Sequence, residues 1–213
     1  MGQLLERPVL IPRPTPEGRP VCLDGIYLRG GGPGLLIVPP LAGAGGSMHA
    51  PVINELAYAA AYGGLASLRF DFRGVGASEG EPDPDPELAL EDAAAAADFL
   101  QESSRGGPEL AVAGYLSGAW TALRLAERLP VTRVILVSPV DPPAAIPTIR
   151  PPVLLVQASA EMGDVAVQRP LQDLLEPLEL LREVVDADSR ALREGLGQLA
   201  RITRRFLGAT PPA

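Results

Sequence analysis

The segment AVAGYLSGAWTA, residues 111–122, joins a short apolar run to a stretch with helical spacing. Gly114 and Gly118 lie two residues before and two residues after Leu116. A sharp turn from a strand into a helix brings the backbones at these flanking positions close together, so both residues must be small. The spacing therefore predicts a tight turn with Leu116 at its apex.

A second frame centres the turn on Ser117 instead. It would place Tyr115 and Ala119 at the two crowded positions. The ring of Tyr115 should clash there, in a type of turn whose backbone is already strained. We therefore favour the frame with Leu116 at the apex and Ser117 one residue beyond it.

On both sides of this turn, short apolar runs alternate with segments of helical spacing. Strands are predicted at 7–12, 21–29, 34–40, 65–70, 109–114, 133–139, 152–158 and 179–186. Helices are predicted at 49–62, 87–102, 118–129, 167–175 and 189–207. Strands separated by helices of about 10–15 residues indicate crossover connections and a parallel sheet. The first two strands are joined by a turn-rich segment, which favours an antiparallel pair at one edge.

The predicted fold is a single α/β domain over residues 1–213, with its core between residues 6 and 207. Its central sheet has about eight mostly parallel strands, an antiparallel N-terminal edge and helices on both faces. A chain of 213 residues, 46% of them apolar, is long enough to bury the core of one such domain.

Two segments have alternative interpretations. In the last predicted helix, apolar residues recur every three or four positions, which favours packing against the sheet over a partner-binding face. These residues are Leu192, Leu196, Leu199, Ile202 and Phe206. Residues 79–92 concentrate carboxylates, but their interleaved prolines favour a solvated loop over a calcium-binding loop. Asp85 or Pro86 is predicted to begin the helix that follows.

Charge and cysteine content exclude several classes of partner and site. The formal net charge is −8, which should repel nucleic acids and anionic membranes. Cys22 is the only cysteine, which excludes an internal disulfide and a thiolate metal cluster. No apolar run approaches about 18 residues, the length of a membrane span, and the N-terminus lacks the apolar core of a signal peptide. We expect a cytoplasmic protein with no metal and no other cofactor.

Several segments, in order along the chain, resemble one protein family. They are LDGIY (23–27), VPPLAGAGGSMHAPVI (38–53), LRFDFRGVGASEG (68–80), VAGYLSGAWTALRLA (112–126), PPVLLVQASAEMGDV (151–165) and REVVDADS (182–189). The set resembles the small, capless bacterial branch of the α/β-hydrolase superfamily that is related to dienelactone hydrolase and serine aminopeptidases. FRGVGASEG, placed between a strand and a helix, is the most specific of these motifs.

The resemblance implies a catalytic triad in the chain order nucleophile, acid, histidine. The nucleophile position falls on Leu116, whose side chain has no oxygen to attack a carbonyl. The histidine position falls on Ser189, and the sequence contains no histidine after residue 49. The acid position falls near Glu161 or Asp164, and the sequence leaves the choice between them open. The resemblance therefore implies a hydrolase fold with a degenerate triad.

The resemblance also implies an oxyanion-binding site and a pocket. The oxyanion donors would be the backbone N–H of Ser117 and an N–H near Leu41 and Ala42. No lid domain is predicted in the proline-rich segment 139–151, so the pocket should be shallow and open. Its expected lining is Leu41, His49, Leu116 and the segment 139–151. Trp120 either forms a wall of this pocket or fills the core beneath it.

Three further polar residues could have either a catalytic or a structural role. His49 is the only histidine, and it could pair with Ser117 in an improvised site with Asp164. A partly exposed histidine near a helix start, with no catalytic role, is favoured. Asp71 and Arg73 resemble catalytic charges, but a structural role in the FRGVGASEG turn is favoured because buried polar groups are generally paired.

Three functions follow from these observations. The favoured one is a protein with the hydrolase fold that has lost catalysis and binds a small ligand or a protein partner. The first alternative is an active serine esterase that uses Ser117 with His49 in altered geometry. The second is a structural subunit whose degenerate pocket is filled. An open apolar surface would also permit self-association into a homo-oligomer.

Overall fold

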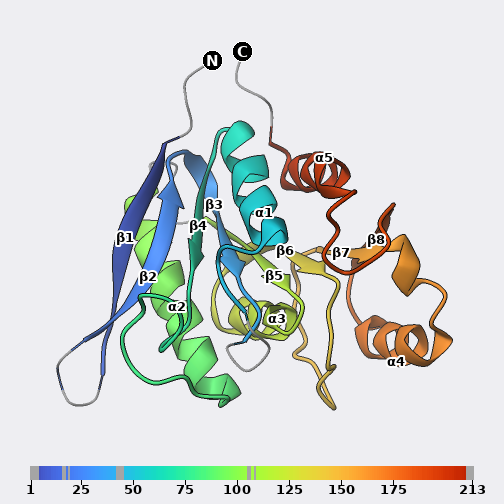
Figure 1. The fold of residues 1–213 in the computed structure, drawn as a ribbon, viewed down its shortest axis with the longest axis horizontal. Coiled ribbons are helices and arrows are strands. Elements are labelled where there is room, and N and C mark those ends of the chain that lie inside the picture. Colours follow the sequence, from blue (N-terminus) through green and yellow to red (C-terminus); the bar gives the residue numbers. More distant parts are fainter. Residues whose placement is uncertain are drawn as a thin grey trace.

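The computed structural model describes residues 5–15, 18, 20–41, 46–104, 107 and 109–209, except for the side chains of 165–167. Eight strands in this part of the chain form one sheet in the order β1-β2-β4-β3-β5-β6-β7-β8. Their bounds are β1 Glu6–Arg13, β2 Val21–Leu28, β3 Gly31–Val38, β4 Leu65–Phe70, β5 Leu110–Tyr115, β6 Val131–Val137, β7 Val153–Ala158 and β8 Leu180–Val185. The pairs β1–β2 and β2–β4 are antiparallel, whereas the pairs from β4 to β8 are parallel. The predicted mostly parallel sheet with an antiparallel edge is confirmed (Figure 1).

Helices cover both faces of the sheet (Figure 1). They are α1 Pro51–Tyr62, α2 Pro86–Ser103, α3 Gly118–Arg128, α4 Val165–Leu175 and α5 Leu196–Leu207, with a short 3₁₀ turn, η2, at Ser159–Glu161. Buried residues of α2, α3 and α4 belong to one hydrophobic cluster, and buried residues of α1 and α5 belong to the other. The described part of the chain is therefore a three-layer sandwich with a core on each side of the sheet. No helix in this part is long and apolar enough to cross a membrane.

Three strands inside the sheet are buried at every position. All six residues of β4, of β5 and of β7 are buried. Strands that are buried along their whole length are typical of sheets that are covered on both faces. The start of α2 is equally well explained by its sequence, because the Asp85 side chain accepts the N–H of Glu87 and Pro86 occupies the first turn.

The last helix differs from the prediction. It begins at Leu196 rather than at residue 189. Leu192 has a φ of 52° and lies in a turn, where its N–H donates to the carbonyl of Ser189. Leu192 is nevertheless fully buried, so it continues the apolar pattern without belonging to the helix. Within α5, the apolar face packs into the core shared with α1, as expected.

The turn after β4 depends on buried polar groups. The Asp71 carboxylate accepts the N–H of Met48 at 2.6 Å, and burial raises the pKa of this carboxyl group. Arg73 forms an ion pair with the fully buried Asp92, with 2.6 Å between Nη2 and Oδ1. Gly76 has a φ of 59°, and a Cβ there would lie 2.7 Å from the Asp71 carboxylate. These contacts give Asp71 and Arg73 the structural role that the sequence favours.

Candidate functional site

The strand–turn–helix at residues 114–118 lies at the end of the sheet where the parallel strands terminate. β5 ends at Tyr115 and α3 begins at Gly118, so two residues make the whole turn. Leu116 has a φ of 51°, in the left-handed region that leucine rarely adopts. This conformation costs roughly 1–2 kcal/mol for a residue with a Cβ. The sharp turn therefore carries backbone strain at Leu116.

Gly114 and Gly118 show why the turn has this frame. A Cβ on Gly114 would lie 2.4 Å from the carbonyl oxygen of Gly118, and a Cβ on Gly118 would lie 2.2 Å from that of Pro39. Neither contact can be relieved by a side-chain rotation, because both partners are backbone atoms. The close approach is centred on Leu116, in the frame that the glycine spacing predicts.

The Leu116 side chain places hydrocarbon at the apex of this turn. It is half-buried and packs against the cluster that α1 and α5 share. A leucine has neither a proton to transfer nor a lone pair to attack a carbonyl. The apex position therefore cannot form a covalent intermediate.

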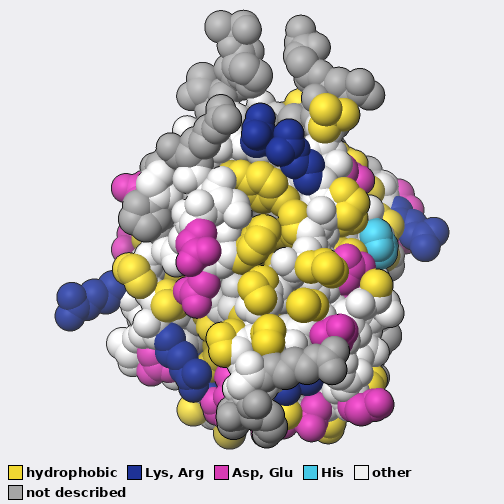
Figure 2. All heavy atoms as spheres, turned by 90° about the vertical axis from the view of Figure 1, so that its left-hand side faces the viewer, with side chains coloured by type: hydrophobic (Ala, Val, Ile, Leu, Met, Phe, Trp, Pro, Cys, Tyr) yellow, Lys and Arg dark blue, Asp and Glu magenta, His cyan; other side chains and the backbone are white. Residues whose placement is uncertain are grey.

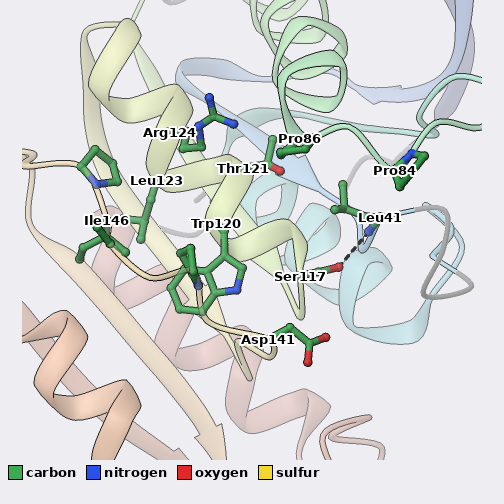
Figure 3. A pocket seen from close by; sticks show the side chains of 13 residues that line it. Leu41, Pro84, Pro86, Ser117, Trp120, Thr121, Leu123, Arg124, Asp141 and Ile146 are labelled. Carbon is green, nitrogen blue, oxygen red and sulfur yellow. Dashed lines mark hydrogen bonds between the residues drawn. The ribbon is translucent and has the colours of Figure 1, made fainter.

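Ser117 lies directly before α3, where its side chain makes no capping hydrogen bond, and it contacts the loop after β3. Its Oγ accepts the backbone N–H of Leu41 at 3.0 Å (Figure 3). The structure thus brings together Ser117 and Leu41, two of the residues expected around an oxyanion site. Ala42, the third, lies outside the described residues.

Glu161 is a buried carboxylate at the end of η2. Its Oε2 accepts the hydroxyl of Ser138 at 2.7 Å and the N–H of Ala158 at 2.8 Å. Asp164, by contrast, is exposed, and its backbone carbonyl accepts the N–H of Gln168 at the start of α4. Of the two carboxylates considered from the sequence, only Glu161 is buried among hydrogen-bond donors.

Arg190 supplies the charge partner of Glu161, with 3.0 Å between its Nε and the Glu161 Oε1. It follows Ser189, whose side chain is exposed and whose carbonyl accepts the N–H of Leu192. The Tyr115 hydroxyl donates to the Arg190 carbonyl at 3.0 Å, and burial together with the nearby Glu161 charge raises the pKa of this tyrosine. A guanidinium is always protonated, so Arg190 cannot act as a general base.

Sequence reasoning missed Arg190. The sequence could have pointed to it, because a buried carboxylate requires a cationic or hydrogen-bonding partner. An arginine directly after the degenerate histidine position was a candidate for that partner.

His49 is exposed and lies just before α1. Its N–H donates to the Ser47 hydroxyl at 3.2 Å, and its carbonyl accepts the Asn54 amide at 3.3 Å. Among the described residues, no hydrogen bond joins His49 to Ser117. Figure 2 shows the chain's single histidine, in cyan, on the surface.

A cavity of about 630 Å³ opens beside Ser117, between α3, the segment before α2 and the segment after β6 (Figure 3). Its lining is Leu41, Pro84, Pro86, Ser117, Trp120, Thr121, Leu123, Arg124, Asp141, Pro143, Ala145, Ile146 and Pro147. Trp120 forms a wall, and its indole N–H donates to the carbonyl of Val140 at 2.5 Å.

The lining differs in part from the expected one. Leu41 and the proline-rich segment contribute to it, but His49 and Leu116 do not. The apex side chain packs toward the α1 side of the sheet, whereas the cavity lies on the α3 side. Sequence reasoning missed Pro84 and Pro86, because nothing in the pattern shows that the start of α2 reaches Leu41. Within the described residues, no group of three or more histidine, cysteine or carboxylate side chains is placed to hold a metal ion.

Comparisons with known proteins agree with this architecture. Residues 33–213 match the family model described as the alpha/beta hydrolase family. A structure of an alpha-beta serine hydrolase homologue from Coxiella burnetii has a TM-score of 0.77 at 24% identity and covers 94% of this chain and 97% of its own. The dienelactone hydrolase of Anabaena variabilis has a TM-score of 0.78 at 19% identity, over 99% of this chain and 100% of its own. At these identities, both structures show the fold alone.

One curated relative is similar in sequence. An uncharacterized protein of Rickettsia prowazekii is 31% identical over 128 residues, which are 58% of this chain. The match spans about half of that relative, 52% of its length. The family model covers most of the present chain, and the sheet order and helix placement agree with it. The chain therefore belongs to the alpha/beta hydrolase family.

Proposed function

We propose that this protein is a member of the hydrolase family that has lost catalysis and that binds a small ligand, or a protein partner, at the cavity beside Ser117. The observation that carries the proposal is Leu116 at the apex of the turn, with a φ of 51°. The residue that the sharp turn projects has no nucleophilic atom, so an acyl intermediate has no attachment point there.

The environment of Glu161 supports the same proposal. In a working triad the acid orients an imidazole, which takes the proton of the nucleophile. Here Glu161 instead pairs with Arg190, and the chain's single histidine is His49. A permanently charged guanidinium can neutralise the carboxylate but cannot accept a proton.

The cavity supports ligand binding in place of catalysis. Its volume of about 630 Å³ lies within the range of small-molecule sites, and most of its lining is apolar. The net charge of −8 argues against nucleic acids and anionic membranes as partners. The proposal includes a cytoplasmic location, and it includes a bacterial cell, which the sequence resemblance implies.

Self-association is a further part of the proposal. Apolar side chains gather on the side of the molecule that carries β1 (Figure 2). Leu5 and Leu10 are 63% and 65% exposed there. Pro8 and Pro12 of β1 lack an N–H, which disfavours extension of the sheet by strand pairing. A homo-oligomer would therefore form through side-chain packing, and light scattering tests for it.

An active serine esterase is the second candidate, and one observation favours it. The Ser117 hydroxyl lines the cavity and lies 3.0 Å from the backbone nitrogen of Leu41. It would need a base within hydrogen-bond reach, and the proposed base, His49, is exposed among other partners.

Turnover of a short-chain aryl ester separates the two candidates. The first predicts that the wild type, Ser117→Ala and the matched control Ser103→Ala all hydrolyse the ester at the rate of buffer alone. Ser103 is a suitable control because it lies in the last turn of α2, whereas Pro86, at the other end of that helix, lines the cavity. Turnover by the wild type and Ser103→Ala that disappears in Ser117→Ala would establish the esterase instead.

A further inference from the structure

The cavity beside Ser117 has walls that favour an uncharged ligand. Leu41, Leu123 and Ile146 supply aliphatic surface, and Trp120 supplies an aromatic face. Four prolines complete much of the remaining lining: Pro84, Pro86, Pro143 and Pro147. A charged group placed against such walls would lose hydration without recovering it, unless polar groups of the cavity were free to bind it.

Three donor groups of the cavity already have acceptors. The Trp120 indole N–H is bonded to the Val140 carbonyl, and the Leu41 N–H is bonded to Ser117 Oγ. The Arg124 guanidinium donates to Glu87, a carboxylate that Arg128 also contacts. These bonds reduce the number of donors with which a carboxylate ligand could replace its lost water.

The charges around the cavity also balance. Arg124 and Arg128 are opposed by Glu87 and by Asp141, which lines the cavity. These four side chains sum to zero charge, so the local field does not draw an anion into the site. The net charge of the whole chain, −8, opposes an anion further.

The Ser117 side chain retains one unused hydrogen-bonding function. Its Oγ accepts the N–H of Leu41, but no described residue accepts its hydroxyl proton. A hydroxyl that accepts one bond can still donate another. Ser117 can thus donate one hydrogen bond into the cavity, while its oxygen occupies the Leu41 amide that an anion would otherwise use.

We propose that the cavity selects uncharged, mainly apolar molecules with one hydrogen-bond acceptor, and that Ser117 determines this selectivity by occupying the Leu41 N–H. The proposal rests on the non-catalytic function and adds the chemical class of the ligand. It makes Ser117 a specificity-determining residue. Removal of its hydroxyl would free the Leu41 amide for a carboxylate oxygen.

Three probes of similar size test this selectivity: cyclohexyl methyl ketone, cyclohexanecarboxylate and ethylcyclohexane. Trp120 is the only tryptophan of the chain and lines the cavity, so its fluorescence reports binding directly, and calorimetry gives the affinities. In the wild type at neutral pH, we expect the ketone to bind saturably. The ketone should bind about threefold to tenfold more tightly than the hydrocarbon, because it accepts one additional hydrogen bond. It should bind at least about tenfold more tightly than the carboxylate.

Three variants of the full chain complete the design. Ser117→Ala should lower the ratio of ketone to carboxylate affinity by about tenfold or more, because the Leu41 amide becomes free. Ser103→Ala should leave that ratio unchanged. Ala145→Phe places a ring in the cavity from an exposed segment and should weaken binding of all three probes.

The proposal is overturned if the carboxylate binds the wild type as tightly as the ketone, if no probe saturates, or if Ser117→Ala leaves the affinity ratio unchanged. None of the probes can be hydrolysed, so these outcomes do not depend on catalysis. Ester turnover would contradict the non-catalytic function but would not change the predicted order of the three probe affinities. If the probe affinities followed another order and no ester were turned over, only the proposed class of ligand would be contradicted.

Discussion

The Nε of Arg190 lies 3.0 Å from Oε1 of Glu161, so a permanent cation neutralises this buried carboxylate. The Glu161 side chain is 5% exposed, whereas that of Arg190 is 42% exposed. Arg190 thus approaches the carboxylate from the solvent side. Charge compensation by arginine stabilises Glu161 without providing a base.

Replacing Arg190 by methionine should destabilise the protein. The buried Glu161 carboxylate would keep its bonds to Ser138 and Ala158 but lose its counter-charge. We expect a loss of about 1–3 kcal/mol in the free energy of unfolding, limited by the water that can reach this side of the pair. Urea denaturation at neutral pH measures it.

A double variant is the control for this prediction. Glu161→Gln removes the charge but keeps an acceptor for Ser138 and Ala158. The double variant with Arg190→Met and Glu161→Gln should therefore lose clearly less free energy of unfolding than the sum of the losses in the two single variants. Additive costs would mean that the ion pair does not couple these residues.

The turn itself should not tolerate a methyl group at either flanking glycine. Gly114→Ala and Gly118→Ala would each place a Cβ less than 2.5 Å from a backbone carbonyl oxygen. We expect each substitution to lower the free energy of unfolding by about 3 kcal/mol or to prevent folding, because the backbone must shift. Gly163→Ala is the matched control, since a Cβ there has no neighbour within 4 Å. Thermal and urea unfolding should show the control close to wild type, and a tolerated Gly114→Ala would refute this geometry.

The fold could be predicted from the alternation of apolar runs with helical segments and from the motifs in their order along the chain, of which FRGVGASEG is the most specific. β5 contains no charged residue, and β4 contains only two polar residues, Ser67 and Arg69, so the positions of both strands could be read from hydrophobicity. The start of α5 could not, since Leu192 is buried at helical spacing yet lies in a turn. The Arg190–Glu161 pair and the approach of Pro84 to the cavity depend on side-chain placement between distant segments. Pattern analysis carries no information about such contacts.

Glu6 should make stability depend on pH at the acid end. Hydrogen bonds from the Tyr58 hydroxyl and from Arg69 hold the pKa of this carboxyl group below its ordinary value of 4.5. A lowered folded-state pKa stabilises the protein fully above pH 4.5, and the contribution is lost as the pH falls through the folded value. Glu6→Gln should therefore lower the free energy of unfolding by about 0.5–1 kcal/mol at neutral pH. The difference from wild type should shrink as the pH falls below 4.5.

Glu102→Gln, at an exposed position near the end of α2, is the control for the pH series. Its unfolding free energy should follow that of the wild type at every pH. If the Glu6→Gln difference instead grew on acidification, the sign of the linkage would be wrong.

The most direct test of lost catalysis is intact-mass spectrometry after exposure to a fluorophosphonate, which labels activated serines. With Leu116 at the apex and Arg190 on Glu161, we predict no added mass on the wild type under conditions that fully label an active serine hydrolase. A single adduct that maps to Ser117 and is absent from Ser117→Ala would contradict the account.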